Sequence, residues 1–248
     1  MRDIAGPLRT VGAVVLDTDG VITDSARLHA QAWKATFDAF LREQPPPSPK
    51  DRRPFDTEVD YPAYVDGKSR RDGAAAFLAS RGVHADAGTV EAVAVAKDRL
   101  YTERLRHGPA VPAYPGTVDL LRALLGGGVL LAAVSASLHA RELLARTQVM
   151  SLFDAVVDGV DSARLGLAGK PAPDLFLEGA RRLGVAPART AIVEDAVAGV
   201  EAGRRGGFGL VVGVDRTPGR TRTAELLRHG ADLVVADLGE LLVKGAVS

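Results

Sequence analysis

Five short apolar runs rich in valine are the feature that most constrains the fold of this chain. Within each run the apolar residues are nearly continuous rather than alternating with polar ones. Continuous apolarity over so few residues is typical of strands buried on both faces, as in a parallel sheet. We therefore predict strands of a buried parallel sheet at residues 13–16, 129–134, 190–193, 210–212 and 233–235.

Segments with helical spacing separate these runs. Leucines at positions 120, 121, 124 and 125 share one helical face, as do the apolar residues between 175 and 183. Gly184 and Pro187 are expected to end the second of these helices. Alternation of strands and helices predicts an α/β fold, a doubly wound Rossmann-like parallel sheet with right-handed crossovers.

The long interval between the first two strands breaks this rhythm. Amphipathic helical patterns fill residues 31–41, 74–80 and 89–106 of it. The proline-rich stretch 44–49 cannot be helical, and we expect an exposed extended loop there. The interval predicts an α-helical domain, or cap, inserted into the core domain that carries the sheet. We expect the core to comprise residues 1–24 and 109–248 and the cap to comprise 25–108.

Composition excludes several classes of function. Basic and acidic residues both number 31, so the zero net charge predicts neither a nucleic-acid nor a membrane partner. The absence of cysteine excludes thiol catalysis and Cys-ligated metals. No apolar stretch is long enough to span a bilayer, and the N-terminal residues lack the apolar core of a signal peptide. We expect a cytoplasmic, monomeric protein with a small-molecule substrate.

Polar side chains follow three of the predicted strands. Asp17 and Asp19 end the first run, Ser135 follows the second, and Glu194 with Asp195 ends the third. Ligands of open α/β sheets bind beyond the carboxyl ends of the strands, so we expect these side chains to converge. Lys170, on a loop that leads into a helix, can reach the same edge.

Converging carboxylates predict phosphoryl-transfer chemistry. They repel one another unless a cation lies among them, and Mg²⁺ is the divalent ion that favours oxygen ligands. One carboxylate can then attack phosphorus, while lysine and Mg²⁺ neutralise the phosphoryl oxygens. Taken singly, each motif also fits a turn, a helix cap or a solvated loop lysine. Their joint order along the chain favours the site.

The same residues resemble the motifs of the haloacid dehalogenase superfamily. Residues 17–24, DTDGVITD, resemble its first motif, DxDGVxxD, and the later polar positions resemble its second, third and fourth. The resemblance implies a Mg²⁺-dependent enzyme with an aspartyl-phosphate intermediate. The implied roles are Asp17 as nucleophile and metal ligand; Asp19 as general acid/base and, through its carbonyl, metal ligand; Ser135, Ala136 and Lys170 as phosphate-binding residues; and Glu194 and Asp195 as metal ligands.

Within the superfamily the chain most resembles the β-phosphoglucomutases and their relatives, which carry a helical cap. Residues 67–70, GKSR, resemble the substrate loop of that cap. The resemblance implies substrate binding by His29, Trp33, Arg70, Lys97 and Ser137. The alternatives are that Trp33 packs in a core and that the three basic cap residues are solvated surface positions.

Four departures separate the chain from the mutase pattern. Leu138 and His139 replace a Lys-Asn pair that contributes to the second phosphate site, and Asp98 replaces an asparagine of the cap. Thr18 replaces an apolar residue between the two aspartates, and the stretch between Trp33 and the substrate loop is longer. Weaker hold on a second phosphate and a larger cap favour a phosphatase over a mutase.

The leading prediction is therefore a Mg²⁺-dependent phosphatase acting on a sugar, cyclitol or (pseudo)disaccharide phosphate. The alternative is a β-phosphoglucomutase that interconverts β-glucose 1-phosphate and glucose 6-phosphate. A catalytically silent binding protein does not require the complete acidic set, and a dehalogenase requires neither Mg²⁺ nor Asp19.

Overall fold

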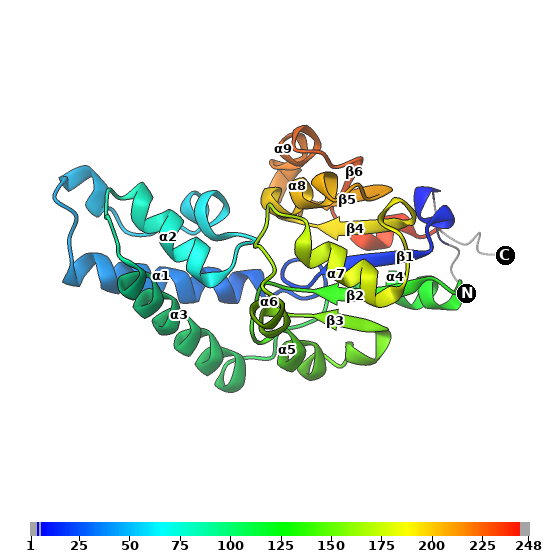
Figure 1. Ribbon diagram of the computed structural model, residues 1–248, viewed down its shortest axis with the longest axis horizontal. Helices are drawn as coiled ribbons and strands as arrows, with labels where there is room; N and C mark the ends of the chain where they lie inside the picture. The colour runs from blue at the N-terminus through cyan, green and yellow to red at the C-terminus, as the bar shows by residue number, and fades with distance from the viewer. Residues whose placement is uncertain (1–3, 5, 244–248) are drawn as a thin grey trace. The chain divides into compact units, whose positions relative to one another are not determined.

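The computed structural model describes residue 4 and residues 6–243, and these fall into two compact units. The core unit joins the chain up to Asp24 to the chain from Pro112 onward (Figure 1). The cap unit runs from Ser25 to Val111. The chain thus returns to the core unit after Val111, a little later than the boundary at 108/109 expected from the sequence.

A six-stranded parallel sheet forms the centre of the core unit, with the strand order β3-β2-β1-β4-β5-β6. This order is that of a doubly wound Rossmann-like sheet, as predicted, and β1 lies at its middle. The five predicted strands are present, whereas the three-residue edge strand β3, which lies between Asp154 and Asp158, was not predicted. The strands are β1 (Ala13–Asp17), β2 (Leu130–Val134), β3 (Ala155–Val157), β4 (Thr190–Glu194), β5 (Leu210–Val214) and β6 (Leu233–Val235).

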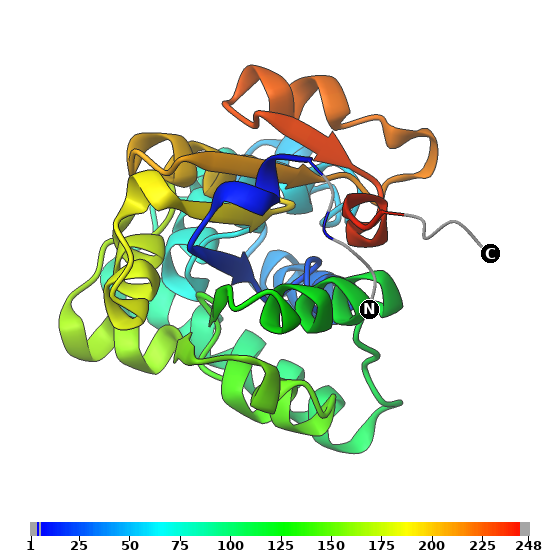
Figure 2. The same cartoon turned by 90° about the vertical axis from the view of Figure 1, so that its right-hand side faces the viewer.

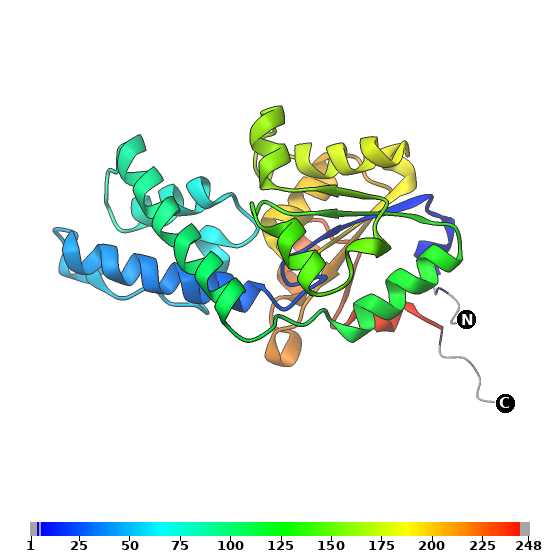
Figure 3. The same cartoon turned by 90° about the horizontal axis from the view of Figure 1, so that it is seen from below.

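Helices cover both faces of this sheet, as Figure 3 shows. Val14 and Leu16 pack with the leucines of α4 on one face, while Val15 packs with Phe176 of α7 on the other. Both faces of β1 are buried, which explains its unbroken apolar sequence. The core helices are α4 (Pro115–Gly126), α5 (Ala140–Arg146), α6 (Gly159–Leu165), α7 (Asp174–Leu183), α8 (Val197–Arg205) and α9 (Thr223–Arg228).

Short 3-10 turns complete the core unit. Figure 2 shows η7 lying beside α4, where Leu238 and Leu241 join the same hydrophobic cluster as the α4 leucines. Gly184 ends α7 in the left-handed conformation, as expected. The turns are η1 (Gly6–Thr10), η4 (Met150–Leu152), η5 (Pro187–Arg189), η6 (Pro218–Arg220) and η7 (Leu238–Leu241). None of the described helices combines the length and apolarity needed to cross a membrane.

The cap unit is helical, as predicted, and has its own hydrophobic core. Phe37, Phe55 and Phe77 pack together there, with ring centroids 4.0 to 5.1 Å apart. The expected exposed loop at 44–49 is corrected in part, because Pro46 is buried and Pro49 begins a 3-10 turn. The elements are α1 (Ala26–Glu43), η2 (Pro49–Arg52), the π-helical turn η3 (Tyr61–Val65), α2 (Arg70–Ser80) and α3 (Ala87–His107).

A buried carboxylate organises the long stretch between α1 and α2. Asp60 is fully buried and accepts two hydrogen bonds from Arg53, at 2.6 and 2.8 Å, and one from Arg81 at 2.7 Å. It also accepts from the backbone nitrogen of Asp56 at 2.9 Å. Since a buried carboxylate is stable only when it is paired and hydrogen-bonded, these four contacts account for the burial of Asp60.

Candidate active site

Three carboxylates meet where the two central strands of the core unit end. Asp17 is the last residue of β1, Glu194 is the last residue of β4, and Asp195 follows it. Because β1 and β4 are parallel neighbours, their carboxyl ends lie side by side. Each carboxylate offers one oxygen, and these oxygens lie within 4.8 Å of one another. An all-oxygen cluster of this kind fits a hard divalent cation such as Mg²⁺.

Lys170 lies against these carboxylates. Its Nζ donates to Asp17 Oδ1 at 2.5 Å and to Glu194 Oε2 at 2.8 Å, and all three side chains are almost fully buried. Burial acts to lower the pKa of Lys170, but the charges of Asp17 and Glu194 outweigh it and hold that pKa above its ordinary value. The ammonium therefore stays charged, as a phosphate-binding group requires.

The electrostatics at Asp17 call for more positive charge than Lys170 supplies. Burial raises the pKa of Asp17 well above its ordinary value; Lys170 opposes the rise, while Glu194 and Asp19 add to it. A nucleophilic carboxylate must be ionised. A cation between Asp17 and Glu194 would favour the ionised form, so the electrostatics and the donor set agree.

A tight turn carries Asp19 beside the nucleophile. The backbone nitrogen of Asp19 donates to Asp17 Oδ2 at 2.9 Å, and Ser135 Oγ donates to Asp19 Oδ2 at 3.0 Å. Gly20 has a φ of +83°, and a Cβ at this position would lie 1.9 Å from Asp195 Oδ2. Only glycine can therefore turn the chain here and leave room for the Asp195 carboxylate.

The loop after β2 supplies the predicted phosphate-binding residues. Ser135 is buried at the end of β2, and the backbone nitrogen of Ser137 donates to its Oγ at 3.0 Å. Ala136 and Ser137 follow on the same loop and are partly exposed. The carbonyl of Ser137 accepts from the backbone nitrogen of Gly159 at 2.9 Å, so the start of α6 supports the loop.

The structure thus brings together the predicted core residues. Asp17, Ser135, Lys170 and the Glu194–Asp195 pair all stand at the carboxyl edge of the sheet, with Asp19 between them. Thr18, which departs from the family pattern, is buried and donates through its hydroxyl to the Val134 carbonyl at 2.9 Å. This bond satisfies the hydroxyl, so its burial costs little.

Within the cap unit, three of the four predicted substrate residues form one buried group, in which Lys97 Nζ lies 5.4 Å from the centroid of the Trp33 ring. Lys97 Nζ lies 2.7 Å from His29 Nδ1, and the His29 ring stacks on Tyr101 with centroids 4.1 Å apart. The solvated-surface alternative is wrong for both residues, because His29 is only 8% exposed and Lys97 only 5%. Trp33 stacks on Phe37 with ring centroids 4.7 Å apart and belongs to the hydrophobic core of the cap. The alternative that Trp33 packs in a core is therefore the one that the structure supports.

Arg70 begins helix α2. Gly67 has a φ of +70°, and Ser69 caps the helix by accepting from the backbone nitrogen of Asp72 at 3.2 Å. Arg70 itself is partly buried and its Nε has no hydrogen-bond partner. The turn at Gly67 and the N-cap at Ser69 thus fix where residues 67–70, which resemble the substrate loop of the family, join helix α2.

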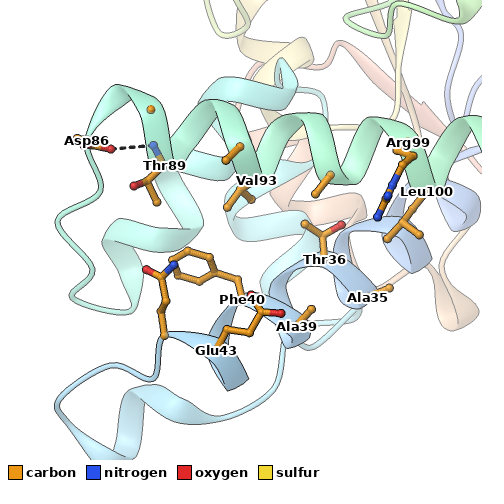
Figure 4. Close-up of a pocket in the computed structure, with 14 residues that line it drawn as sticks. Ala35, Thr36, Ala39, Phe40, Glu43, Asp86, Thr89, Val93, Arg99 and Leu100 are labelled. Carbon is orange, nitrogen blue, oxygen red and sulfur yellow. Dashed lines mark hydrogen bonds between the residues drawn. The ribbon is translucent and has the colours of Figure 1, made fainter.

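A separate pocket of about 600 Å³ lies between α1 and α3 of the cap unit (Figure 4). Ala35, Ala39, Val93 and Leu100 line it, with Arg99 at its side (Figure 4). None of the predicted site residues lines this pocket. It is therefore not a cavity formed by the predicted substrate residues.

Sequence reasoning missed two residues of this region. Gly199 lies in α8, where a Cβ would stand 2.1 Å from Glu194 Cδ. Arg216 follows β5 and donates to the carbonyl of Gly20 at 3.1 Å. The signal for Arg216 was available, because the run at 210–214 also ends in polar residues, Asp215 and Arg216, at the same edge of the sheet.

Comparison with known proteins agrees with this geometry. Residues 11–207 match the family described as haloacid dehalogenase-like hydrolases. The chain belongs to this family. It is 42% identical over 248 residues to a β-phosphoglucomutase of Mycobacterium bovis, in an alignment that covers 96% of this chain and 94% of the relative. It is therefore a phosphoryl-transfer enzyme of the β-phosphoglucomutase-like subfamily.

Two further similarities are informative. A trehalose-phosphate phosphatase of Mycobacterium leprae is 37% identical over 129 residues, which cover 52% of this chain and 28% of that protein. The crystal structure of a β-phosphoglucomutase from Clostridium difficile superposes with a TM-score of 0.73 at 24% identity, covering 93% of both chains. The second similarity establishes the shared fold.

Proposed function

We propose that this haloacid dehalogenase-like enzyme is a Mg²⁺-dependent phosphomutase that interconverts β-glucose 1-phosphate and glucose 6-phosphate. The observation that carries the proposal is the 42% identity to a β-phosphoglucomutase across almost the whole of both chains. The sequence alone favoured a phosphatase and kept the mutase as the alternative. Because the similarity extends over almost the whole of that mutase, we now favour the mutase.

In the proposed reaction, Asp17 attacks phosphorus and the bond to the sugar oxygen breaks. Asp19 gives its proton to the departing oxygen, and later takes the proton of the hydroxyl that attacks the aspartyl phosphate. Ser135, the Ala136 backbone and Lys170 hold the phosphoryl oxygens. Mg²⁺, held by Asp17, Glu194, Asp195 and the Asp19 carbonyl, would neutralise charge on the transferring group.

The cap, residues 25–108, is proposed to select the substrate. We assign the second phosphate to Arg70 at the start of α2, because a guanidinium at a helix N-terminus is a strong phosphate donor and the Arg70 Nε has no partner within the protein. His29, Lys97 and Ser137 remain proposed substrate residues, whereas Trp33 packs in the hydrophobic core of the cap. The monomeric state, the cytoplasmic location and the lack of a nucleic-acid partner remain predictions.

A phosphatase for a larger sugar phosphate is the second candidate. Leu138 and His139 stand where the mutase resemblance predicts a lysine and an asparagine. A charged hydrogen bond contributes about 1.5–3 kcal/mol, so their loss weakens the hold on a second phosphate. Water can then reach the aspartyl phosphate before the second sugar hydroxyl does.

One incubation distinguishes the two. The enzyme is supplied with Mg²⁺ and β-glucose 1-phosphate, with and without a trace of glucose 1,6-bisphosphate, and both glucose 6-phosphate and inorganic phosphate are measured. The mutase produces glucose 6-phosphate that depends on the bisphosphate, with little free phosphate. A phosphatase releases free phosphate instead, and a panel of disaccharide phosphates then identifies its preference.

The Asp17→Asn variant is the control for the mechanism. It removes the nucleophile but keeps the shape of the side chain, so it should abolish both products. Full activity in this variant would contradict the aspartyl-phosphate mechanism, whichever product the wild type forms.

A further inference from the structure

Arg216 contacts several groups around the turn that follows β1. It follows β5 at the carboxyl edge of the sheet. Its Nε donates to the Gly20 carbonyl at 3.1 Å, and its Nη1 donates to the Ala236 carbonyl at 3.1 Å and to Asp237 Oδ2 at 2.9 Å. One guanidinium therefore joins the turn after β1 to the segment after β6.

The same guanidinium packs on a tyrosine that also holds the turn. Arg216 Cζ lies 3.6 Å from the centroid of the Tyr114 ring, close enough for a cation–π contact. Tyr114 donates from its backbone nitrogen to the Ile22 carbonyl at 3.0 Å and from its hydroxyl to Asp24 Oδ1 at 3.1 Å. Arg216 and Tyr114 thus both hold residues 20–24 through hydrogen bonds.

The Thr117 hydroxyl also links Arg216 to the turn after β1. Arg216 Nη2 donates weakly to Thr117 Oγ1 at 3.4 Å, and Thr117 Oγ1 donates to the Val21 carbonyl at 2.9 Å. Both the Gly20 and the Val21 carbonyls therefore accept hydrogen bonds from this group of side chains. All of these residues belong to the core unit.

The backbone that carries Arg216 is itself held firmly. Asp215 is 2% exposed, and its carboxylate accepts from the backbone nitrogens of Thr217 at 3.1 Å and Arg222 at 3.0 Å. It also accepts from Thr223 Oγ1 at 2.8 Å. The backbone at Arg216 is fixed and its guanidinium has several fixed acceptors, so this side chain has little freedom to move. It therefore couples the position of the turn after β1 to that of β5.

We propose that Arg216 is a positioning residue for Asp19. The turn closes on itself, because the backbone nitrogens of Ile22 and Thr23 donate to the Thr18 carbonyl at 3.1 and 3.0 Å. These internal bonds set the shape of the turn, and Arg216 sets where that turn stands relative to β5 and β6. Asp19 directly precedes Gly20, whose carbonyl accepts from Arg216. The Asp19 carboxyl is thereby held where it can exchange a proton with the substrate.

This inference rests on the proposed role of Asp19 as general acid, and it predicts a selective defect. A sugar alkoxide needs a proton as it leaves, whereas p-nitrophenolate leaves without one. Arg216→Ala should lower kcat/KM for glucose 1,6-bisphosphate by about 10- to 100-fold, because a misplacement of about 1 Å has effects of this size. It should change kcat/KM for p-nitrophenyl phosphate by a few-fold at most. Equal losses on the two substrates, or no loss on either, would overturn the proposal.

Two further variants make the test decisive. Arg220→Ala, on the same loop, removes a side chain that donates to the Val234 carbonyl and not to the turn, so both substrates should react normally. Arg216→Lys keeps the charge but places all of its donors on one nitrogen instead of three, so it should show the same selectivity in weaker form. This milder variant decides the matter if Arg216→Ala does not fold.

Asp19→Asn separates this inference from the proposed function. If Asp19→Asn is selectively impaired on the bisphosphate and Arg216→Ala is not, the positioning role is wrong and the acid role of Asp19 stands. If Asp19→Asn affects both substrates equally, the assignment of Asp19 as general acid is wrong, and the positioning role fails with it.

Discussion

At the scale of single residues, the site depends on two positions that carry no side chain. Gly20 lies against the Asp195 carboxylate and Gly199 lies against Glu194, so any Cβ would collide with a predicted metal ligand. For Gly20 the sequence motif already indicates this role. For Gly199, which lies in an ordinary helix, only the structure shows that the Glu194 side chain lies against this position of α8.

Gly199→Ala should therefore weaken Mg²⁺ binding. A Cβ 2.1 Å from Glu194 Cδ forces the carboxylate to move, and displaced ligands or supporting groups typically lower metal affinity by about 10- to 100-fold. The helix itself gains, because alanine favours helix over glycine by about 1 kcal/mol. Isothermal titration with Mg²⁺ measures the affinity, and circular dichroism checks the fold.

Gly88→Ala is the matched control, since the nearest atom to its Cβ is Asp86 Oδ1 at 3.6 Å and it lies in the cap helix α3. This variant should bind Mg²⁺ as the wild type does. Unchanged Mg²⁺ affinity in Gly199→Ala would show that Glu194 does not contribute to a metal site.

At the scale of elements, strand β3 shows what local sequence cannot reveal. It has three residues, and arginines from α5 and α7 donate to the carbonyl of the middle one. Arg141 and Arg182 both donate to the Val156 carbonyl at 2.7 Å, and both donate to Asp161 Oδ2 at 3.0 Å. These long-range bonds help to hold an edge strand that was not predicted from the sequence.

This cluster predicts a pH-dependent contribution to stability. Hydrogen bonds from Arg182, together with those from Arg164 and Arg141, hold the pKa of Asp161 well below its ordinary value, although burial opposes them. Its pKa in the unfolded chain is about 3.9, so the stabilisation is complete above that pH and is lost as the pH falls toward the lower folded value.

Asp161→Asn should therefore lower the free energy of unfolding by about 1–3 kcal/mol at pH 7, and the deficit should shrink below about pH 4. Urea unfolding at pH 7, 5 and 3 measures it. Glu103→Gln, at an exposed position of the cap, serves as the comparison and should show a small effect at each pH. A deficit that grows at acid pH would contradict the assignment.

At the scale of the whole molecule, the predicted metal ligands all belong to the core unit. A ligand that binds only the native state stabilises the unit that holds it. Mg²⁺ at about 100 times its Kd should stabilise the wild type by about 2.7 kcal/mol, which raises Tm by several degrees.

Thermal unfolding in Mg²⁺ and in EDTA measures this difference. Asp195→Asn should lose most of the shift, because it replaces one carboxylate of the cluster with a neutral amide. If the wild type and Asp195→Asn gain the same Tm from Mg²⁺, the ion binds elsewhere on the protein.

The sequence by itself determined the parallel sheet, the inserted helical cap and the acidic set at the strand ends. These features follow from local patterns: unbroken apolarity for buried strands, helical spacing for helices, and polar residues where a buried strand stops. The first motif and the order of the later ones also indicated the family.

Only the tertiary structure decided the rest, because it depends on residues far apart in the chain. No periodic pattern in the sequence indicates that Lys97 pairs with His29 or that Gly199 contacts Glu194. Nor does one indicate that Arg216 donates to the Gly20 carbonyl. The edge strand β3 and the burial of Pro46 are likewise set by what packs against them. Local patterns specify which face of an element is buried, whereas packing specifies which partner it meets.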